Sequence, residues 1–361
     1  MKWRPLGSTW MEKPASCGAV AVIGILRGEL FAGRTKPGEQ LNWDRNRILP
    51  SINSPSGALP ARFRRERLLI VGCGDIGQRV ARDLRGRMQL VALTSSADRV
   101  GALRAARIRP LVGNLDDAAT LRRLAGVATR VLHLAPPARD GGAAWWRDQR
   151  TTELARALRL RSLPSAFVYG STSGVYGDCG GARVDETRGV RPDTPRSHRR
   201  VDAERAVRWL GRSAGVRASI LRIPGIYAPD RENGTPRGRL QRGTPVLRHE
   251  DDVYTSHIHA DDLARACIAA LFRGKPQRIV HASDDTELRM GDYVDLAADM
   301  YGMPRPPRVA RGEAERQLPL QLLSFMGESR RLDNTRLKRE LRVRLAHPTV
   351  HTGLREQTEP R

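Results

Sequence analysis

The sequence predicts an α/β fold in which one parallel sheet is covered by helices on both faces. Two observations lead to this prediction. Short apolar segments alternate with helical segments from Leu68 onward. The first apolar segment also runs directly into a glycine-rich turn and the start of an amphipathic helix. Short apolar strands separated by helices are typical of a parallel sheet that is buried on both sides.

Seven apolar segments are predicted as strands, and four amphipathic segments between them as helices. The strands are Leu68–Val71, Gln89–Leu93, Pro110–Val112, Arg130–Leu134, Ala166–Gly170, Ser219–Arg222 and Arg278–His281. The helices are Gln78–Leu84, Leu115–Ala125, Thr151–Arg161 and Val201–Ser213, and Met290–Gly302 and Asp333–Leu341 are two more after the last strands. This alternation favours a doubly wound sheet of the Rossmann type.

The glycine-rich turn predicts a dinucleotide phosphate site. Gly72, Gly74 and Gly77 have the G-x-G-x-x-G spacing, with Asp75 and Ile76 between the last two. The first glycine permits the turn, the second lets the backbone approach a pyrophosphate, and the third lets helix and strand pack closely. The N–H groups at the start of the helix then face the phosphates. The position between a strand and a helix is the context that this motif requires.

The end of the second strand bears on the choice between NAD and NADP. An acidic residue about 20 positions after the first glycine would favour NAD. The strand ends instead with Thr94 and Ser95, and Arg99 follows. Small hydroxyls and an arginine suit a 2′-phosphate, which favours NADP over NAD. The alternative is that these residues simply begin the next helix.

The composition is strongly basic, which raises the question of nucleic acid. The chain has 361 residues and a formal net charge of +24, and all but five of its 63 basic residues are arginines. The arginines are spread along the chain, and no homeodomain, zinc-finger, KH or RNP-type signature accompanies them. We expect non-specific attraction to polyanions and no specific nucleic-acid partner. A nucleic-acid binder remains the less favoured alternative.

The cysteines and the hydropathy predict a cytoplasmic protein. Cys17, Cys73, Cys179 and Cys267 form no C-x-x-C pair, and a chain of this size does not need disulfides. No apolar run approaches the roughly 20 residues of a membrane span. Gly18–Leu26 is apolar but short, and a signal peptide is disfavoured.

Composition also predicts the domain organisation. Residues 1–66 are rich in Gly, Pro, Asn and Arg, and we expect a disordered N-terminal extension, or a start codon assigned too far upstream. Residues 67–225 and 253–283 are predicted to form an NAD(P)-binding domain. Residues 226–252 and 284–354 are predicted to form a small substrate lobe over the carboxyl ends of the strands, where open α/β folds bind ligands.

Four further motifs carry a resemblance to a known family. They are GSTSGVYGD at 170–178, LRIPGIYAP at 221–229, HADDLA at 259–264 and RLDN at 331–334. Together with the glycine turn they resemble the extended short-chain dehydrogenase/reductases, the NAD-dependent epimerase/dehydratase group, from about Arg67 to Leu354. The resemblance implies an NAD(P)-dependent oxidoreductase or epimerase that acts on a small molecule through hydride transfer at the nicotinamide C4. It also implies a monomer or a homodimer and leaves the substrate open.

The resemblance assigns roles to individual residues. Thr172 holds the place of the hydroxyl that bonds the reacting oxygen. The family then has Tyr-x-x-x-Lys, and this chain has Arg196 and Arg200 in those two places. Arginine stays protonated, so Arg196 cannot transfer a proton, whereas Arg200 is able to hold the cofactor ribose. Three further residues are expected to contact the cofactor, and they are Asn114, Ala135 and Pro224.

Three interpretations of the missing tyrosine remain open. His198 or Tyr227 is a substitute proton donor, and His198 has a suitable unperturbed pKa of about 6.5. Alternatively, hydride passes to an acceptor, such as a quinone, that takes its proton from water. The third interpretation is a non-catalytic sensor or scaffold that binds NAD(P) without turnover.

The group His257, His259, Asp261 and Asp262 resembles a metal site in composition. Zinc usually recruits three or four ligands, and no further ligand set is recognisable, so we expect no metal. Asp261 is expected instead to cap a helix that begins near Leu263.

Overall fold

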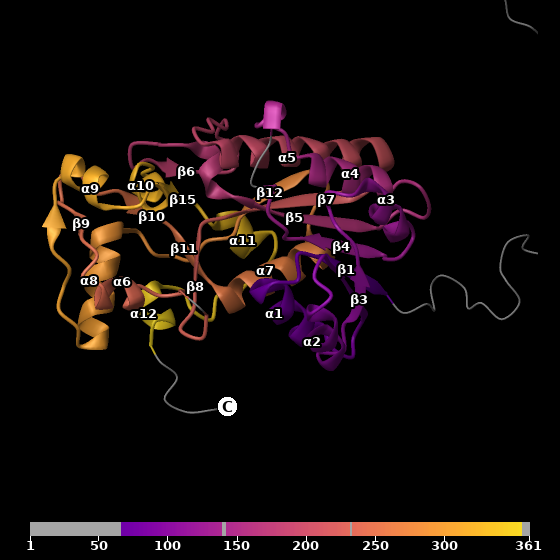
Figure 1. Ribbon diagram of the computed structural model, residues 1–361, viewed down its shortest axis with the longest axis horizontal. Helices are drawn as coiled ribbons and strands as arrows, with labels where there is room; N and C mark the ends of the chain where they lie inside the picture. The colour runs from indigo at the N-terminus through magenta and orange to yellow at the C-terminus, as the bar shows by residue number, and fades with distance from the viewer. Residues whose placement is uncertain (1–65, 139–141, 232, 356–361) are drawn as a thin grey trace, which may run out of the picture. The chain divides into compact units, whose positions relative to one another are not determined.

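The seven predicted strands form one parallel sheet in the computed structural model, which describes residues 66–138, 142–231 and 233–355. The strand order is β12-β7-β5-β4-β1-β2-β3 (Figure 1). The strands are β1 (Arg67–Val71), β2 (Gln89–Thr94), β3 (Arg109–Val112), β4 (Arg130–His133), β5 (Ala166–Thr172), β7 (Arg217–Ile223) and β12 (Arg278–His281). This confirms the predicted doubly wound fold, with every strand boundary within two residues. The expected extension lies outside the described residues, apart from Glu66.

Alternating side chains of the strands explain why helices cover both faces. In β1, Leu68 and Ile70 point to one face and Leu69 and Val71 to the other, and all four are fully buried. The first face is covered by α1 (Asp75–Leu84), α2 (Arg99–Ala105) and α7 (Ala260–Arg273), and the second by α3 (Ala118–Leu121), α4 (Gln149–Ala157) and α5 (Pro195–Ala214). Figure 1 shows α1 and α7 on the opposite side of the sheet from α4 and α5.

The strand order reverses at β1. The chain runs outward through β2 and β3 and then returns to the other side of β1, where β4 pairs in parallel. The loops after β1 and β4 therefore leave the sheet in opposite directions. In open α/β sheets, ligands bind at this reversal, outside the carboxyl ends of the strands.

Helix α5 begins six residues before the predicted Val201. Thr194 is its N-cap and accepts the Ser197 N–H, and the Ser197 hydroxyl accepts the Thr194 N–H in return, which makes a capping box. Pro195 occupies the first turn, where its missing N–H costs nothing. Gly215, with φ of +65°, ends the helix. The early start places Arg196 and Arg200 in the first turns of α5, close to the end of β5.

Other predicted helices are present with altered bounds. The segment Leu115–Ala125 holds α3 and the 3₁₀ turn η2 (Arg122–Leu124). Helix α8 spans Met290–Tyr301 and α11 spans Thr335–Arg339, each inside its predicted range. No helix among the described residues combines the length and the apolar character needed to cross a membrane.

Short elements complete the fold after β5 and β7. Three parallel pairs join β15 to β6, β11 to β8 and β14 to β9, and an antiparallel pair joins β10 to β13. Two small apolar clusters lie among the elements that follow β7. The predicted division into a nucleotide domain and a lobe stays a prediction. The remaining elements are η3 (Gly142–Ala144), η4 (Ser173–Tyr176), β6 (Arg183–Val184), β8 (Gly225–Tyr227), α6 (Arg237–Gln241), β9 (Val246–Leu247), β10 (Tyr254–Thr255), β11 (His257–His259), β13 (Leu288–Arg289), β14 (Arg308–Val309), α9 (Arg311–Gln317), α10 (Leu320–Met326), β15 (Arg331–Leu332) and α12 (Val350–Gly353).

Candidate functional site

Two of the three glycines are required by close packing. Gly72 has φ of +87°, and a Cβ there would lie 2.3 Å from the Ala135 backbone nitrogen. A Cβ on Gly77 would lie 3.1 Å from Ile70 Cγ2 and 3.2 Å from the Gly72 oxygen. Any side chain at Gly72 would therefore push β1 and the loop after β4 apart, and one at Gly77 would press α1 away from β1. These are the contacts expected for the first and third glycines of a dinucleotide turn.

The middle glycine instead faces open space. No atom lies within 4 Å of the position that a Cβ on Gly74 would take. The helix begins directly after it, and the first intrahelical bond runs from the Gln78 N–H to the Gly74 oxygen. The N–H groups of Asp75, Ile76 and Gly77 precede that bond, at the positive end of the helix dipole. An open cradle with bare N–H groups suits a pyrophosphate.

The carboxylate of Asp75 is neutralised within the protein. It lies 2.9 Å from Arg79 Nε and 3.1 Å from Arg231 Nε. Arg79 is 6% exposed, and its other nitrogens bond Asp230 at 2.7 Å and Asp261 at 2.6 Å. Burial lowers the pKa of Arg79, but the three carboxylates outweigh it and raise the pKa overall. An acidic group at the start of the helix would repel phosphate, and these two arginines remove that repulsion.

The residues expected to choose between NAD and NADP lie beside the glycine turn. Arg99 Nη2 donates to the Cys73 carbonyl at 2.5 Å, which holds its guanidinium over the turn. Thr94 is buried, and its hydroxyl donates to the Ser96 oxygen at 3.2 Å. Ser95 is exposed. The structure thus brings a cation and one exposed hydroxyl to the end of β2, where the acid typical of NAD sites is replaced.

Three other expected cofactor contacts lie just after strands. Asn114 follows β3, and its side-chain oxygen accepts the Asp116 N–H at 3.0 Å. Ala135 follows β4, and its N–H donates to the Val71 oxygen at 3.0 Å. Pro224 follows β7 directly. All three are therefore at the carboxyl edge of the sheet.

The end of β5 is held by buried ionic contacts. The Ser171 hydroxyl donates to Glu204 at 2.7 Å, and Glu204 forms a two-bond pair with Arg222 at 2.7 and 3.0 Å. Both charged side chains are at most 4% exposed. The next residue, Thr172, caps the turn η4 by accepting the Gly174 N–H at 3.3 Å. The network fixes the strand end from which Thr172 presents its hydroxyl.

The two arginines in place of tyrosine and lysine differ in their surroundings. Arg200 is buried, and its Nη1 donates to the Tyr169 hydroxyl at 3.0 Å and to the Gly170 carbonyl at 2.7 Å. Burial raises the pKa of Tyr169 to about 12, so this hydroxyl stays neutral. Arg196 lies one turn earlier on the same side of α5 and is exposed. The chain thus has a fixed cation and an exposed cation where the family has a lysine and a tyrosine.

The two substitute proton donors have their contacts elsewhere. The ring of His198 packs edge-on against Trp145, with 5.1 Å between ring centres. Its two-residue offset from Arg196 and Arg200 also puts it on another side of the helix. Tyr227 is 2% exposed and donates to the Thr349 carbonyl at 3.2 Å, and burial raises its pKa. No described contact joins either side chain to Thr172.

Sequence reasoning missed two residues, Glu328 and Arg330, which come from the loop before β15. Thr172 Oγ1 and Glu328 Oε2 lie 3.6 and 3.7 Å from the position that a Cβ on Gly174 would take. The carboxylate of Glu328 also pairs with Arg330 at 2.6 Å. Arg330 in turn donates to the Gly177 carbonyl at 3.0 Å and to the Ser173 hydroxyl at 3.3 Å. A largely buried carboxylate and its arginine therefore form one wall of the site around Thr172.

A buried imidazole ends β4 but does not serve as an acid. His133 Nε2 lies 3.0 Å from the Thr151 hydroxyl, which donates to Asp148 at 2.6 Å. Burial lowers the pKa of His133 to about 3, and the charge of Arg200 adds to this effect. The ring is thus neutral at physiological pH and ties β4 to α4.

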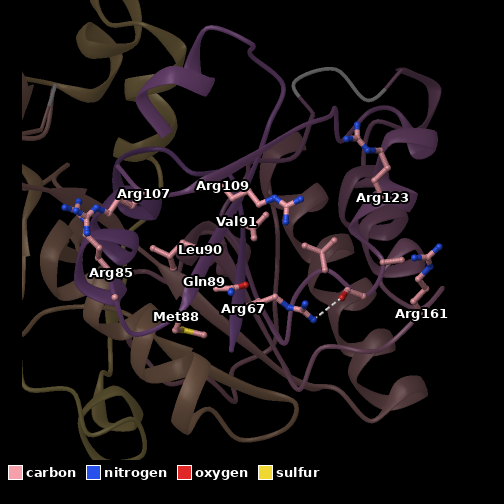
Figure 2. A pocket seen from close by; sticks show the side chains of 14 residues that line it. Arg67, Arg85, Met88, Gln89, Leu90, Val91, Arg107, Arg109, Arg123 and Arg161 are labelled. Carbon is pink, nitrogen blue, oxygen red and sulfur yellow. Dashed lines mark hydrogen bonds between the residues drawn. The ribbon is translucent and has the colours of Figure 1, made fainter. Parts of the chain in front are cut away.

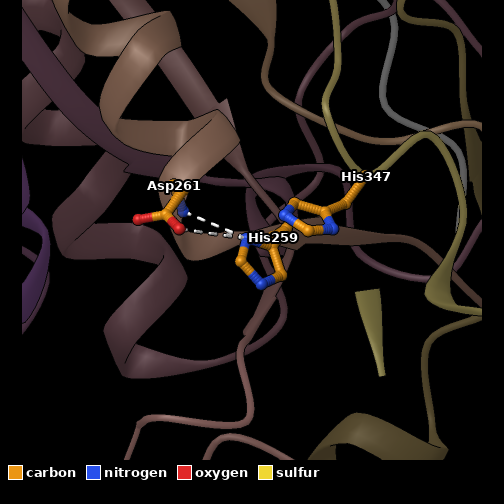
Figure 3. Close-up of side chains that lie close together, drawn as sticks. All are labelled: His259, Asp261 and His347. Atoms are coloured by element: carbon orange, nitrogen blue, oxygen red, sulfur yellow. Dashed lines mark hydrogen bonds and ion pairs between the residues drawn. The ribbon is translucent and has the colours of Figure 1, made fainter. Parts of the chain in front are cut away.

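One group of possible metal ligands lies at the start of α7. Ligand atoms of His259, Asp261 and His347 lie within 4.8 Å of one another (Figure 3). His259 Nδ1 already accepts the Asp261 N–H at 3.2 Å. Asp261 Oδ1 already pairs with Arg79 at 2.6 Å and Arg82 at 3.1 Å. A metal ion would have to displace these contacts and lie beside two guanidinium groups, so the donor set does not suit one.

The prediction that Asp261 caps the helix after β11 is wrong. Helix α7 begins at Ala260, and its N-cap is His259, whose ring accepts the Asp261 N–H. The carboxylate of Asp262 is fully buried and accepts the Ala346 and His347 N–H groups at 2.8 Å each. A histidine ring nitrogen thus takes the place of the usual carboxylate cap.

A comparison with protein families finds one match. The family model described as "NAD dependent epimerase/dehydratase family" matches residues 68–282, which is more than half of the chain. This range contains the glycine turn, Thr172, Arg196 and Arg200. A comparison with curated proteins finds no match.

Solved structures share the fold over most of the chain. A functionally unknown conserved protein from Silicibacter pomeroyi DSS is 28% identical, with a TM-score of 0.63, and the match covers 80% of this chain and 96% of that one. A UDP-glucose 4-epimerase from Thermotoga maritima is 18% identical, with a TM-score of 0.66 and the same two coverages. A dTDP-glucose 4,6-dehydratase double mutant from Streptomyces venezuelae, solved with NAD, is 21% identical, with a TM-score of 0.64 and coverages of 80% and 95%. At these identities the last two show the fold alone.

Proposed function

Because this chain belongs to the NAD-dependent epimerase/dehydratase family, we propose that it is an oxidoreductase that binds a nicotinamide dinucleotide at the turn after β1. The observation that carries the proposal is Gly74, which borders open space at the start of α1. Such a dinucleotide supplies a hydride acceptor or donor at the nicotinamide C4. The protein's part is to hold the phosphates, orient the substrate and manage the proton.

The phosphate contacts come from the backbone in this proposal. The N–H groups of Asp75, Ile76 and Gly77 would bond the pyrophosphate, and Gly74 would leave room for it. Ile76 itself is buried, so only its backbone is available. The Asp75 carboxylate stays with its two arginines.

We propose NADP as the preferred dinucleotide. Arg99 lies over the glycine turn, and its guanidinium would pair with a 2′-phosphate, with Ser95 beside it. A carboxylate at the end of β2 would instead bond a 2′-hydroxyl, and the strand has none there. Asn114, Ala135 and Pro224 would line the rest of the dinucleotide at the same edge of the sheet.

The reacting end lies around Thr172. The Thr172 hydroxyl would orient the reacting oxygen, and Arg200 would bond the cofactor ribose while anchored to β5. Glu328 is the group that we assign to the proton, since its carboxylate faces the same point above Gly174 as Thr172. In the oxidation of an alcohol, Glu328 Oε2 would accept the hydroxyl proton, and the dinucleotide would supply the hydride acceptor. In the reduction of a carbonyl, Glu328 would return that proton to the oxygen.

A binding titration tests the proposal. We expect NADPH, and more weakly NADH, to bind the purified protein with a change in nicotinamide fluorescence. Gly74→Asp should abolish binding, because it places bulk and negative charge in the phosphate cradle. Gly189→Asp is the matched control, since Gly189 also has no atom within 4 Å of its Cβ position and lies in a loop after β6. No binding of either dinucleotide at millimolar concentration would end the proposal.

The second candidate is a sensor or scaffold that binds NAD(P) without turnover, and Arg196 in the place of the tyrosine favours it. It predicts dinucleotide binding without hydride exchange toward any carbonyl, quinone or sugar-nucleotide panel. Turnover that is lost in Thr172→Ala and in Glu328→Gln, with dinucleotide affinity retained, would reject this candidate. Turnover retained in Glu328→Gln and independent of pH would favour a quinone-like acceptor that is protonated by water.

The same proposal extends to the substrate, the assembly and the compartment of the protein. We propose that it acts on a small molecule, as a monomer or a homodimer, in a reducing cytoplasm. The cysteines among the described residues, Cys73, Cys179 and Cys267, are free thiols. Free thiols are usual in a reducing compartment.

A further inference from the structure

A cavity lies at the amino ends of the strands, at the edge of the sheet opposite the glycine turn. It has a volume of about 780 Å³ and is formed at the amino ends of β1, β2 and β3, together with the loops that lead into β4 and β5. The fourteen residues that line it are Arg67, Arg85, Gly86, Met88, Gln89, Leu90, Val91, Arg107, Arg109, Arg123, Ala125, Gly126, Val127 and Arg161. Since the strands are parallel, the length of the sheet separates this cavity from the dinucleotide site.

The lining is cationic and contains no acid. Six of the fourteen residues are arginines, and none is Asp or Glu. Figure 2 shows Arg67 and Arg109 in the middle, Arg85 and Arg107 to one side, and Arg123 and Arg161 to the other. The six come from five separate segments of the chain, since only Arg107 and Arg109 are neighbours in sequence. The fold therefore gathers cations that the sequence keeps apart.

These arginines lack counter-ions within the described part of the chain. None of the six pairs with a carboxylate there. Arg67 and Arg123 each donate one long bond, of 3.4 Å, to the carbonyls of Gly126 and Val112. Arg67 Nε is buried and has no hydrogen-bond partner in the described structure. Unmet donors that face a shared space are the arrangement expected of an anion site.

Arginines elsewhere in the chain show that pairing is available to this fold. Arg79 bonds three carboxylates, Arg308 lies within 4 Å of three, and Arg222 is paired inside the core. The six arginines of the cavity have no such partner among the described residues, and they line one shared space.

We propose that this cavity is a second binding site, which takes a compact polyanion that carries several phosphate groups. Guanidinium groups bond phosphate through paired N–H donors, and several of them surround one space here. The volume lies within the roughly 300–1,000 Å³ usual for small-molecule sites. A nucleic-acid backbone would instead need a stripe of cations along a face or a helix. The proposal does not depend on the proposed dinucleotide function.

Calorimetric titration of the full chain with inorganic tripolyphosphate tests the proposal, at 50 and 150 mM salt. The altered protein carries Arg85→Gln, Arg109→Gln and Arg161→Gln, which are exposed and make no described side-chain hydrogen bond. The control protein carries Arg205→Gln, Arg212→Gln and Arg339→Gln, which are also exposed and lie outside the cavity. Both triples remove three charges, so net charge is matched.

We expect one tripolyphosphate per chain, with affinity at least tenfold weaker in the cavity triple and changed less than twofold in the control triple. Equal weakening in both triples would overturn the proposal, because net charge alone would then explain binding. Loss of binding in Gly74→Asp with retention in the cavity triple would also overturn it, since the anion would then lie at the glycine turn. Duplex DNA bound through the cavity arginines, with no binding of tripolyphosphate, would replace it by a nucleic-acid surface.

A second titration distinguishes the two sources of the phosphate groups. Tighter binding of ATP than of tripolyphosphate, lost in the cavity triple, would assign the site to a nucleoside polyphosphate. Equal binding would assign it to the polyphosphate group alone. Either result supports a compact polyanion as the ligand.

Discussion

Gly72 and Gly74 are separated by one residue, but an added methyl group should destabilise the protein at Gly72 and leave it folded at Gly74. In Gly72→Ala, the new Cβ would lie 2.3, 2.7 and 2.8 Å from three backbone atoms of Leu134 and Ala135, at φ of +87°. The left-handed conformation costs an alanine about 1–2 kcal/mol, and overpacking adds about 1–3 kcal/mol. We expect Gly72→Ala to lose about 3 kcal/mol in the free energy of unfolding.

Gly74→Ala should leave the fold intact and weaken dinucleotide binding. Its φ is −78°, and no atom lies within 4 Å of the new Cβ. A glycine-to-alanine change at a compatible position stabilises a protein by about 0.4–1 kcal/mol. The methyl group would, however, stand where the pyrophosphate approaches the helix. Losing one charge-assisted hydrogen bond costs about 1.5–3 kcal/mol, so dinucleotide affinity should fall about 10- to 150-fold.

Urea denaturation and nicotinamide fluorescence on the same preparations measure both effects. Gly189→Ala, with no neighbour within 4 Å, should differ from the unaltered protein by no more than about 1 kcal/mol in stability and should match its dinucleotide affinity. The reasoning is refuted if Gly72→Ala unfolds at the same urea concentration as the unaltered protein. It is equally refuted if Gly74→Ala binds the dinucleotide with unchanged affinity.

Three further predictions concern charge. Glu204→Gln should lower the free energy of unfolding in urea by about 3–5 kcal/mol, because it leaves Arg222 buried and unpaired, and adding Arg222→Met should recover most of this loss. Arg99→Ala should weaken the affinity for NADPH at least tenfold and that for NADH less than twofold in the fluorescence titration. Equal losses of affinity would contradict a 2′-phosphate contact. Burial raises the pKa of Asp284 from 3.8 to about 7, so the stability that its protonated carboxyl group provides is present at low pH and is lost as the pH rises through 7. Between pH 5 and pH 8, the free energy of unfolding of Asp284→Asn should therefore rise by about 2–3 kcal/mol relative to that of the unaltered protein. A difference between the two proteins that does not change with pH would be evidence against this pKa shift.

The sheet could be predicted because its signals are local. Each strand is a short apolar run, and the glycine turn follows the first one directly. Thr194 and Pro195 also mark the true start of α5, and recognising a threonine N-cap followed by proline would have corrected the predicted Val201. The signals of fold thus lie within a few residues of each element.

The site could be predicted only in part because its far wall comes from distant sequence. Glu328 and Arg330 lie more than 150 residues after Thr172, and no spacing rule joins them. The three carboxylates around Arg79 likewise come from three segments, and only Asp75 has a local signal, its i, i+4 spacing. Burial, too, is decided by tertiary packing, as in Tyr227, whose hydroxyl bonds the Thr349 carbonyl 122 residues later in the chain.

The pairing of β15 with β6 has a consequence for synthesis of the chain. The seven-stranded sheet is complete once the ribosome has passed β12, at about residue 281, whereas Glu328 and Arg330 emerge some 50 residues later. A nascent chain would thus hold every strand of the sheet before it contains the two residues that we propose beside the substrate. Shortened proteins that stop after β12 should therefore bind the proposed dinucleotide without turning over a substrate.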